Sequence, residues 1–349
     1  MYKSKIIADS LSPQGDRLIS FVIKLPKIVV SEFYTHKMFT VTSSLEKNSF
    51  MRNIEELKLN FFTPISYIKR NLVTGKSKFL NNESDLKVDK EKWVQSKQES
   101  VHRALNLFYS GVDPELCTRL LEPFMISNVI ITTSKESLED FFKMKCPQYE
   151  MMTSYNICKY KSKKDFLNNV GLPDEKSNYS SWNYFDWLQI NKSKEDIHIQ
   201  QIAEMMWDSM NESKPKQLEA GEWHIPFDDD IKSENFKILC LNNPYDNEEE
   251  LRVEISTSKC SEVSYQNTSK DYKLHIEQFK MLVETKQFKF FEHCSIVMDN
   301  LEYNSYHTGK NDIEPNHNTT TQEDVEYLRS CMGWCKNYRG FIPLSEIII

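Results

Sequence analysis

A strand followed directly by a capped helix is the feature that most constrains the fold of this chain. Residues 128–133 (NVIITT) are rich in β-branched side chains, which is typical of a short β-strand. Ser134 comes next and can cap a helix by accepting a hydrogen bond from its first turn. Residues 135–145 have a helical apolar period, so we expect a strand that leads at once into a helix. The predicted buried face of that helix consists of Leu138, Phe141, Phe142 and Met144.

Other segments extend this alternation of strands and helices. Residues 17–34 are predicted to form a strand, with Pro26 at an edge or bulge position. The remaining predicted elements are helices at 91–110 (ending at Gly111), from Asp113-Pro114 to Pro123, at 195–210 and at 270–285, and a strand at 251–256. Residues 147–194 have little sustained period, and we interpret them as an insertion. No internal repeat is visible, and an α/β or α+β fold is expected.

Composition excludes several classes of protein. A chain of 349 residues can bury a substantial core, and 20 Phe and 16 Tyr with only 8 Gly argue against disorder. No stretch approaches the roughly 18 apolar residues of a membrane span, and the first residues lack the apolar region of a secretion signal. We therefore expect a cytoplasmic protein without a membrane partner. The net charge of −7 argues against a general nucleic-acid-binding surface.

The common catalytic and metal-binding motifs are missing from the sequence. It contains no Walker-type phosphate loop, no GxGxxG and no HExxH motif. Cys331 and Cys335 are the only closely spaced cysteines, and a structural zinc site usually needs two such pairs. We therefore predict reduced, buried thiols and no metal site.

Residues 35–40 (THKMFT) suggest an anion-binding segment. His36 and Lys37 stand between polar neighbours, and the following residues 41–47 (VTSSLEK) add hydroxyls and the cation of Lys47. Such groups can hold phosphate oxygens by charge-assisted hydrogen bonds. The pattern is weak by itself, because runs of basic and hydroxyl residues are usually solvated surface.

Several segments in a fixed order resemble the flavin-dependent thymidylate synthases, the ThyX family, and particularly their divergent phage-type branch. The resembling segments are 35–40 (THKMFT), 118–124 (TRLLEPF), 131–133 (ITT) with 141–145 (FFKMK), 199–206 (IQQIAEMM), 221–227 (GEWHIPF), 260–265 (CSEVSY), 291–293 (FEH) and 337–341 (NYRGF). In the shorter cellular enzymes, the segments that resemble 263–265 and 291–293 precede the signature. The order here is consistent with a circular permutation, which chains with neighbouring termini tolerate.

The resemblance implies a fold, a reaction and a set of partners. The fold would be a mixed, mainly antiparallel sheet flanked by helices, in a homotetramer whose sites lie between subunits. The enzyme would transfer a one-carbon unit from 5,10-methylenetetrahydrofolate to C5 of dUMP, with FAD reduced by NADPH supplying the hydride. A phage-encoded enzyme would act in the cytoplasm of its host. The implied organisation is a core at 1–146, the insertion at 147–194, a core helix with the GEWHIPF segment at 195–227, an acidic linker at 228–250 and a C-terminal segment at 251–349 that completes the flavin site.

The resemblance also assigns site residues, position by position. The implied flavin-binding residues are His36, Lys37, Asp140, Ser264 and His293. The implied substrate-binding residues are Glu32, Thr42, Lys47, Arg119 and Lys145, of which Lys145 would also face the reacting pyrimidine ring. Glu32 lies one helical turn before His36. Arg119 stands on an otherwise apolar helix, where a buried cation would need a partner such as phosphate. His293 fits a flavin contact or a core histidine equally well, and His224 is predicted to be structural.

Departures from the family pattern leave three hypotheses open. Lysine replaces arginine at Lys37, Lys47 and Lys145, which keeps the charge but loses the planar bidentate fork. The first hypothesis is a flavin-dependent pyrimidine C5 methylase. The second is a 5-hydroxymethylase acting on dUMP or dCMP, suggested by Lys145 together with Asp140. The third is a non-catalytic structural or interaction subunit, suggested by the weakened signature and the insertion.

Overall fold

A five-stranded sheet forms the centre of the computed structural model. The structure describes residues 2–43, 50–64, 68–70, 77–79, 83–147, 149–152, 157–160, 163–170, 196–242, 247–262, 271–298 and 340–348. The sheet contains β1 (Lys3–Leu11), β2 (Arg17–Pro26), β3 (Thr40–Ser43), β6 (Ile126–Ser134) and β9 (Lys216–Gln217), in the order β3-β6-β2-β1-β9. Every pairing is antiparallel except β1 with β9. The predicted mixed, mainly antiparallel sheet flanked by helices is confirmed.

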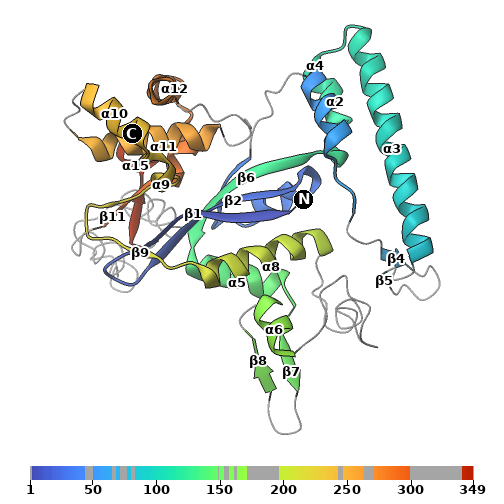
Figure 1. The fold of residues 1–349 in the computed structure, drawn as a ribbon, viewed down its shortest axis with the longest axis horizontal. Helices are drawn as coiled ribbons and strands as arrows, with labels where there is room; N and C mark the ends of the chain where they lie inside the picture. Colours follow the sequence, from blue (N-terminus) through green and yellow to red (C-terminus); the bar gives the residue numbers. More distant parts are fainter. Residues whose placement is uncertain are drawn as a thin grey trace, which may run out of the picture.

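One face of the sheet is apolar and is covered by two helices, α5 (Lys135–Lys145) and α8 (Ile197–Glu212). Side chains alternate along a strand, so every second residue of β2 points to this face. These residues are Ile19, Phe21, Ile23 and Leu25, all fully buried. They pack with the apolar residues of α5 and α8 in one core cluster. Figure 1 shows α5 and α8 lying together along one side of the central strands.

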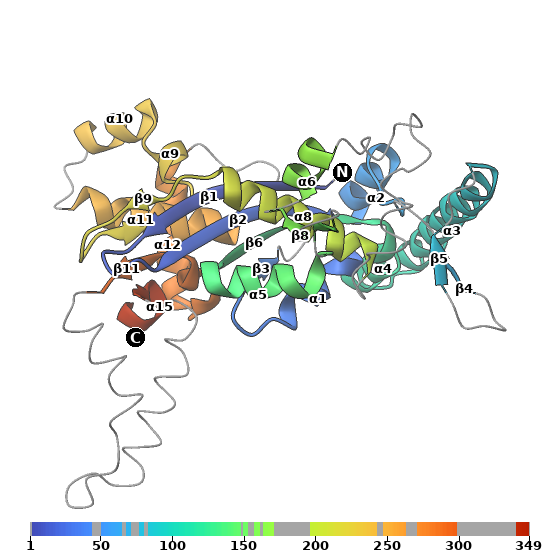
Figure 2. The same ribbon diagram turned by 90° about the horizontal axis from the view of Figure 1, so that it is seen from below.

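The C-terminal part of the chain forms a second layer with its own core. It contains the three-stranded sheet of β10 (Trp223–His224), β11 (Ser295–Val297) and β12 (Phe341–Pro343). Its helices are α9 (Asp228–Ile231), α10 (Glu234–Asn242), α11 (Glu248–Ser261), α12 (Tyr272–Glu284), the 3-10 helix η3 (Phe288–His293) and α15 (Leu344–Ile348). These elements gather at one end of the molecule in both views (Figures 1 and 2). The 3-10 helix η3 contacts β3 and β6, so this layer meets the face of the sheet that α5 and α8 leave open.

A third cluster lies at the other end of the molecule (Figure 1). It joins α2 (Phe50–Leu59), the long α3 (Glu83–Tyr109), α4 (Pro114–Arg119) and the 3-10 helix η2 (Glu122–Phe124). Helix α4 begins as predicted, because the Asp113 side chain accepts hydrogen bonds from the first-turn amides and Pro114 follows it. Two hairpins, β4 (Ile68–Arg70) with β5 (Ser77–Phe79) and β7 (Glu150–Met152) with β8 (Ile157–Lys159), and helix α6 (Lys163–Val170) complete the described elements.

The predicted unit of strand, cap and helix is present at 126–145. Strand β6 ends at Ser134, whose hydroxyl accepts a hydrogen bond from the amide of Ser137, and α5 spans the predicted residues. Leu138, Phe141 and Phe142 are buried as expected. Met144 is not, because it lies beside the buried face, with its side chain 51 % exposed. The prediction was therefore correct for the element and wrong for one residue of its face.

Three other predictions were wrong. Residues 27–34 do not continue strand β2, because Pro26 ends it and the chain turns into the 3-10 helix η1 (Lys27–Val29) and helix α1 (Val30–Tyr34). Residues 251–256 are not a strand but part of α11. The described residues of the expected acidic linker are helical, and the apolar residues Ile231, Phe236 and Leu239 contribute to the core of the C-terminal layer. The division into domains stays a prediction.

Candidate functional site

Two of the predicted site residues meet where α1 approaches α5. The Lys145 ammonium lies 3.5 Å from the Glu32 carboxylate. The Lys145 side chain is only 8 % exposed, whereas that of Glu32 is 44 % exposed. A cation so far removed from water needs an anionic partner, which Glu32 provides. Because the carboxylate is the exposed member, the ion pair can be reached from solvent on the side of α1.

His36 and Lys37 lie in the turn that follows α1. The His36 amide donates to the Phe33 carbonyl, and the Phe39 amide donates to the His36 carbonyl, so the backbone of this turn is fixed. The His36 ring lies edge-on to Phe141, with 4.9 Å between ring centroids. Phe141 precedes Lys145 by one turn of α5, so the two predicted segments 35–40 and 141–145 are in contact. Lys37 is exposed in the same turn.

The two threonines of β3 face η3. Thr40 and Thr42 point to the same side of the strand because their positions differ by two. Thr40 donates to the Glu292 carboxylate over 3.2 Å, and Thr42 forms a 2.7 Å hydrogen bond with Nε2 of His293. Burial raises the pKa of Glu292, which the hydrogen bond from Thr40 partly opposes. Two consecutive residues of η3, Glu292 and His293, thus form hydrogen bonds with alternate residues of the edge strand β3.

The contact between Thr42 and His293 is the end of a buried chain of hydrogen bonds that crosses the sheet. In order, its members are Ser10, His224, Ser20, Thr132, His293 and Thr42. Successive polar atoms are 2.6 to 2.8 Å apart, and no member is more than 5 % exposed. Ser20 and Thr132 stand opposite each other in the β2–β6 register, which brings their hydroxyls together. We call these six residues the hydroxyl–histidine chain.

Both histidines of the chain are uncharged at neutral pH. Burial lowers the pKa of His224 to about 3, with a small opposing effect of Asp9. Burial also lowers the pKa of His293 to about 3, and the neighbouring His224 lowers it further. A neutral imidazole donates through one nitrogen and accepts through the other, so each ring uses both nitrogens within the chain. His224 is therefore structural, as predicted, and His293 is a satisfied core histidine in this conformation.

Arg119 and Asp140 lie apart from these groups. Arg119 was expected to be buried, but its side chain is 59 % exposed and pairs with Glu122 at 2.8 Å and Glu115 at 3.4 Å. That expectation failed because the apolar residues of α4 that pack inward lie on the opposite side of this short helix. Asp140 is exposed on α5 and pairs with Lys143 at 3.0 Å. Lys47 and Ser264 lie outside the described residues.

Sequence reasoning missed several of the polar groups that the structure brings together. Glu292 stands inside the quoted segment 291–293 but received no role. Ser10, Ser20 and Thr132 were also missed, although Ser20 is a hydroxyl residue within the predominantly apolar strand β2. A buried hydroxyl needs a hydrogen-bond partner. That requirement indicates that each hydroxyl has a partner. It does not identify the partner, which lies more than 100 positions away in the sequence.

The described residues suit an anion better than they suit a whole flavin. His36, Lys37 and Lys145 bring cationic or donor groups to one corner, and such groups bind phosphate oxygens. His293, by contrast, has both ring nitrogens engaged and presents no donor to a flavin ring. Within the described residues, no three His, Cys, Asp or Glu side chains are grouped to hold a metal ion. Nor does any helix there have the length and apolarity needed to cross a membrane.

Comparison with known proteins gave structural neighbours but no sequence relatives. No protein-family profile matches the sequence, and no curated protein sequence matches it. Several solved structures resemble parts of the chain, among them two of the UMP/dUMP methylase PolB from Streptomyces cacaoi, bound with 5-Br UMP or 5-Br dUMP. The first is 13 % identical with a TM-score of 0.31 and covers 42 % of this chain and 78 % of its own. The second is 11 % identical with a TM-score of 0.30 and covers 44 % and 63 %, respectively. These similarities are too weak to assign a family or a function.

Proposed function

We propose that the chain is a pyrimidine nucleotide C5-modifying enzyme of the flavin-dependent thymidylate synthase type. One observation carries the proposal. Residues of two separate signature segments, His36 in 35–40 and Phe141 with Lys145 in 141–145, lie in contact, and Glu32 joins them through the ion pair. The convergence of these segments in the fold supports the resemblance.

The chemistry of this corner fits recognition of a nucleotide. Lys145 and Lys37 supply positive charge for a phosphate or a ring carbonyl, and Glu32 supplies a carboxylate that can accept a hydrogen bond from a ring N–H. Glu32 also holds the nearly buried Lys145 side chain in position until a ligand arrives. We propose dUMP as the substrate, with 5,10-methylenetetrahydrofolate as the one-carbon donor. When bound, a reduced flavin would supply the hydride, with NADPH as its reductant.

A second candidate function, a non-catalytic structural or interaction subunit, is favoured by two observations. Both nitrogens of His293 are used inside the hydroxyl–histidine chain. Arg119, which the resemblance assigns to the nucleotide phosphate, is exposed and already paired with two glutamates. Either arrangement removes a ligand contact that the family pattern implies. Asp140 does not support the 5-hydroxymethylase alternative, because its carboxylate pairs with Lys143 on the surface of α5.

Visible absorption spectroscopy tests the proposal directly. We expect the purified protein to bind added FAD and its flavin spectrum to shift when dUMP, but not dCMP, is added. Lys145→Met should abolish the shift while the fold persists by circular dichroism. Lys143→Met is the matched control, because this lysine is on the same helix but pairs outward with Asp140. A folded protein that binds neither flavin nor nucleotide would refute the enzyme and support the subunit, and a dCMP response would redirect the substrate assignment.

A further inference from the structure

A cleft of about 340 Å³ lies on the side of the sheet formed by β1 and β9. Strand β3, which α1 contacts, is at the other edge, so the cleft is separate from the corner of Glu32 and Lys145. Its walls come from β1, the segment after α8, β10 and α9. The lining residues that matter here are Lys5, Lys214, Lys216, Trp223, Phe227 and Asp230. The volume falls within the ~300–1,000 Å³ typical of small-molecule pockets.

The charge balance of the cleft is positive. Within the described residues, Lys5, Lys214 and Lys216 form no ion pair and no side-chain hydrogen bond. Two of the carboxylates that line the cleft are already neutralised. Asp9 receives two hydrogen bonds from Arg17, at 2.8 and 2.7 Å, and Asp228 pairs with Arg252 at 2.6 Å and Lys232 at 2.5 Å. Three free ammonium groups around one cleft favour an anionic ligand, which is notable in a chain whose net charge is −7.

A buried cation behind the cleft also favours an anionic ligand. Lys259 on α11 is only 9 % exposed and forms no ion pair among the described residues. Its ammonium lies 5.5 Å from the centroid of the Phe227 ring, and Phe227 lines the cleft. Burial lowers the pKa of Lys259, the nearby Asp230 opposes that shift, and Lys5 adds to it. Lys5 and Asp230 both line the cleft, so the positive charge of Lys259, which Asp230 and Glu262 partly offset, acts on the same site.

The aromatic wall of the cleft is held in an unusual conformation. Phe227 has φ of 62° and ψ of 17°, in the left-handed region that a bulky residue rarely adopts. Its amide donates to the Ile7 carbonyl over 3.0 Å, which ties the aromatic wall to β1. Such strain persists only where the surroundings impose it, and it occurs preferentially at ligand sites.

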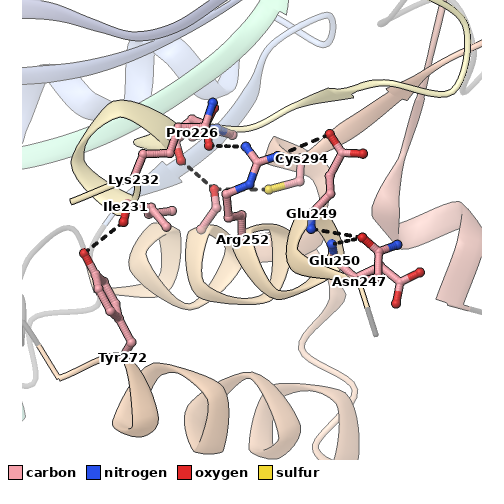
Figure 3. A network of polar contacts seen from close by, with 11 residues as sticks. Pro226, Ile231, Lys232, Asn247, Glu249, Glu250, Arg252, Tyr272 and Cys294 are labelled. Carbon is pink, nitrogen blue, oxygen red and sulfur yellow. Dashed lines mark hydrogen bonds and ion pairs between the residues drawn. The ribbon is translucent and has the colours of Figure 1, made fainter. Parts of the chain in front are cut away.

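Helix α9, which follows Phe227, is fixed from behind by α11 and α12. Figure 3 shows Arg252 and Tyr272, on these two helices, both reaching toward the segment that contains Pro226, Ile231 and Lys232. The Tyr272 hydroxyl donates to the Ile231 carbonyl, and the Ser256 hydroxyl donates to the Pro226 carbonyl over 2.6 Å. The wall is therefore preorganised, which lowers the entropic cost of binding.

We propose that this cleft binds a nucleoside monophosphate, with its phosphate at Lys214 and Lys216 and its flat ring against Trp223 and Phe227. Lysine ammonium groups hold phosphate oxygens, and aromatic side chains stack on a nucleobase of any identity. Asp229 and Asp230 stand exposed on the α9 rim, where they can accept hydrogen bonds from sugar hydroxyls or base amines. The site is distinct from the corner of Glu32 and Lys145 and does not depend on the function proposed for that corner.

Calorimetric titration of the full chain carrying Lys145→Met isolates the cleft from the proposed substrate site. We expect one equivalent of UMP or AMP to bind, more tightly than uridine or inorganic phosphate alone, and less tightly at high salt. The double charge reversal K214E/K216E should weaken binding by at least about tenfold. The control K58E/K90E makes the same change of net charge on exposed lysines of α2 and α3 and should leave affinity unchanged. Trp223→Phe should remove the nucleotide-dependent quenching of tryptophan fluorescence.

Three results would overturn the proposal. The first is the absence of monophosphate binding by a folded Lys145→Met protein that still shows the wild-type thermal transition. The second is equal affinity of K214E/K216E and K58E/K90E. The third is uridine binding as tightly as UMP, because the lysines would then hold no phosphate. Lys259→Met gives an independent readout: removing the buried charge should raise Tm without ligand and weaken UMP binding.

Discussion

The two faces of the central sheet are both buried, but they are built on different chemistry. Toward α5 and α8, β2 presents Ile19, Phe21, Ile23 and Leu25. Toward the C-terminal layer, the same strand presents Ser20, which belongs to the hydroxyl–histidine chain. The first face is held by non-directional burial of apolar area. The second combines hydrogen bonds that must each find a partner with a small apolar cluster of Leu18, Leu218, Val297 and Phe341. The comparison shows that the burial of a sheet face does not determine whether apolar or hydrogen-bonding groups pack against it.

The apolar face should respond most strongly to truncation. Phe21 is fully buried, so Phe21→Ala is expected to lower the free energy of unfolding by about 3–5 kcal/mol, through lost transfer energy and the cavity left behind. Urea unfolding followed by circular dichroism measures this directly. Phe21→Leu, which keeps most of the volume, should cost much less. A loss below about 1 kcal/mol for the alanine variant would show that this face is not the main source of stability.

The hydroxyl–histidine face should be distinguished by its response to acid. His224 and His293 have folded pKa values of about 3, against 6.5 for an unperturbed histidine. Below pH 6.5 the unfolded chain therefore binds protons that the folded chain does not bind. The contribution of the two histidines to the free energy of unfolding is present above pH 6.5 and is lost as the pH falls toward 3. Between pH 6.5 and 5 the expected loss is about 1.6 kcal/mol per histidine.

Unfolding free energies measured across pH 5 to 6.5 test this when the wild-type protein is compared with a histidine variant, because carboxylates with a raised pKa, such as Glu292, contribute equally to both. Replacing His293 by Gln should reduce the slope by the contribution of one proton, even if the variant is less stable at every pH. The explanation is wrong if the slope of the wild-type protein matches that of the variant.

Breaking the chain at its centre should have an intermediate effect. Thr132→Val keeps the shape but removes the hydroxyl that joins Ser20 to His293. Each buried partner left without a hydrogen bond costs about 1–3 kcal/mol. Thr132→Ser keeps the hydroxyl and serves as the control, so the two variants should differ by at least about 1 kcal/mol in thermal or urea unfolding.

The smallest effect is expected far from both faces. Arg119→Ala removes two exposed ion pairs, with Glu115 and Glu122, and should change stability by less than about 1 kcal/mol. Thermal unfolding at low and at high salt provides the measurement. A larger, salt-dependent loss would mean that Arg119 supports the packing of α4 and is not simply a surface cation.

The elements that could be predicted from the sequence were those with local signals. Ser134 marked the start of α5, and Asp113 with Pro114 marked that of α4, because capping depends on residues within one turn. The helix at 251–256 was mistaken for a strand because Leu251, Val253 and Ile255 alternate like a half-buried strand. The helix begins at Glu248, where the amides bond to the Asn247 side chain, a cap that lies upstream of the alternating residues.

The candidate site was predictable only in part, for a similar reason. Resemblance placed Glu32, His36 and Lys145 in one site, and the structure brings them to one corner. The burial of His293 and the exposure of Arg119 depend on which side of a short helix packs inward. The hydroxyl–histidine chain depends on strand register and on docking of residues that are far apart in the sequence. Neither kind of information is local to the residues concerned.

The hydroxyl–histidine chain has a consequence for synthesis of the chain on the ribosome. Its last member along the sequence is His293, so the sheet strands up to β6 emerge long before the C-terminal layer that will cover them. During that interval Ser10, Ser20, Thr42 and Thr132 can bond to water, whereas an apolar surface of equal size would attract other nascent chains. These positions can therefore stay hydrated until the C-terminal layer covers them. A protein that completes its second layer last exposes less apolar area in its half-built state when part of the covered face is polar.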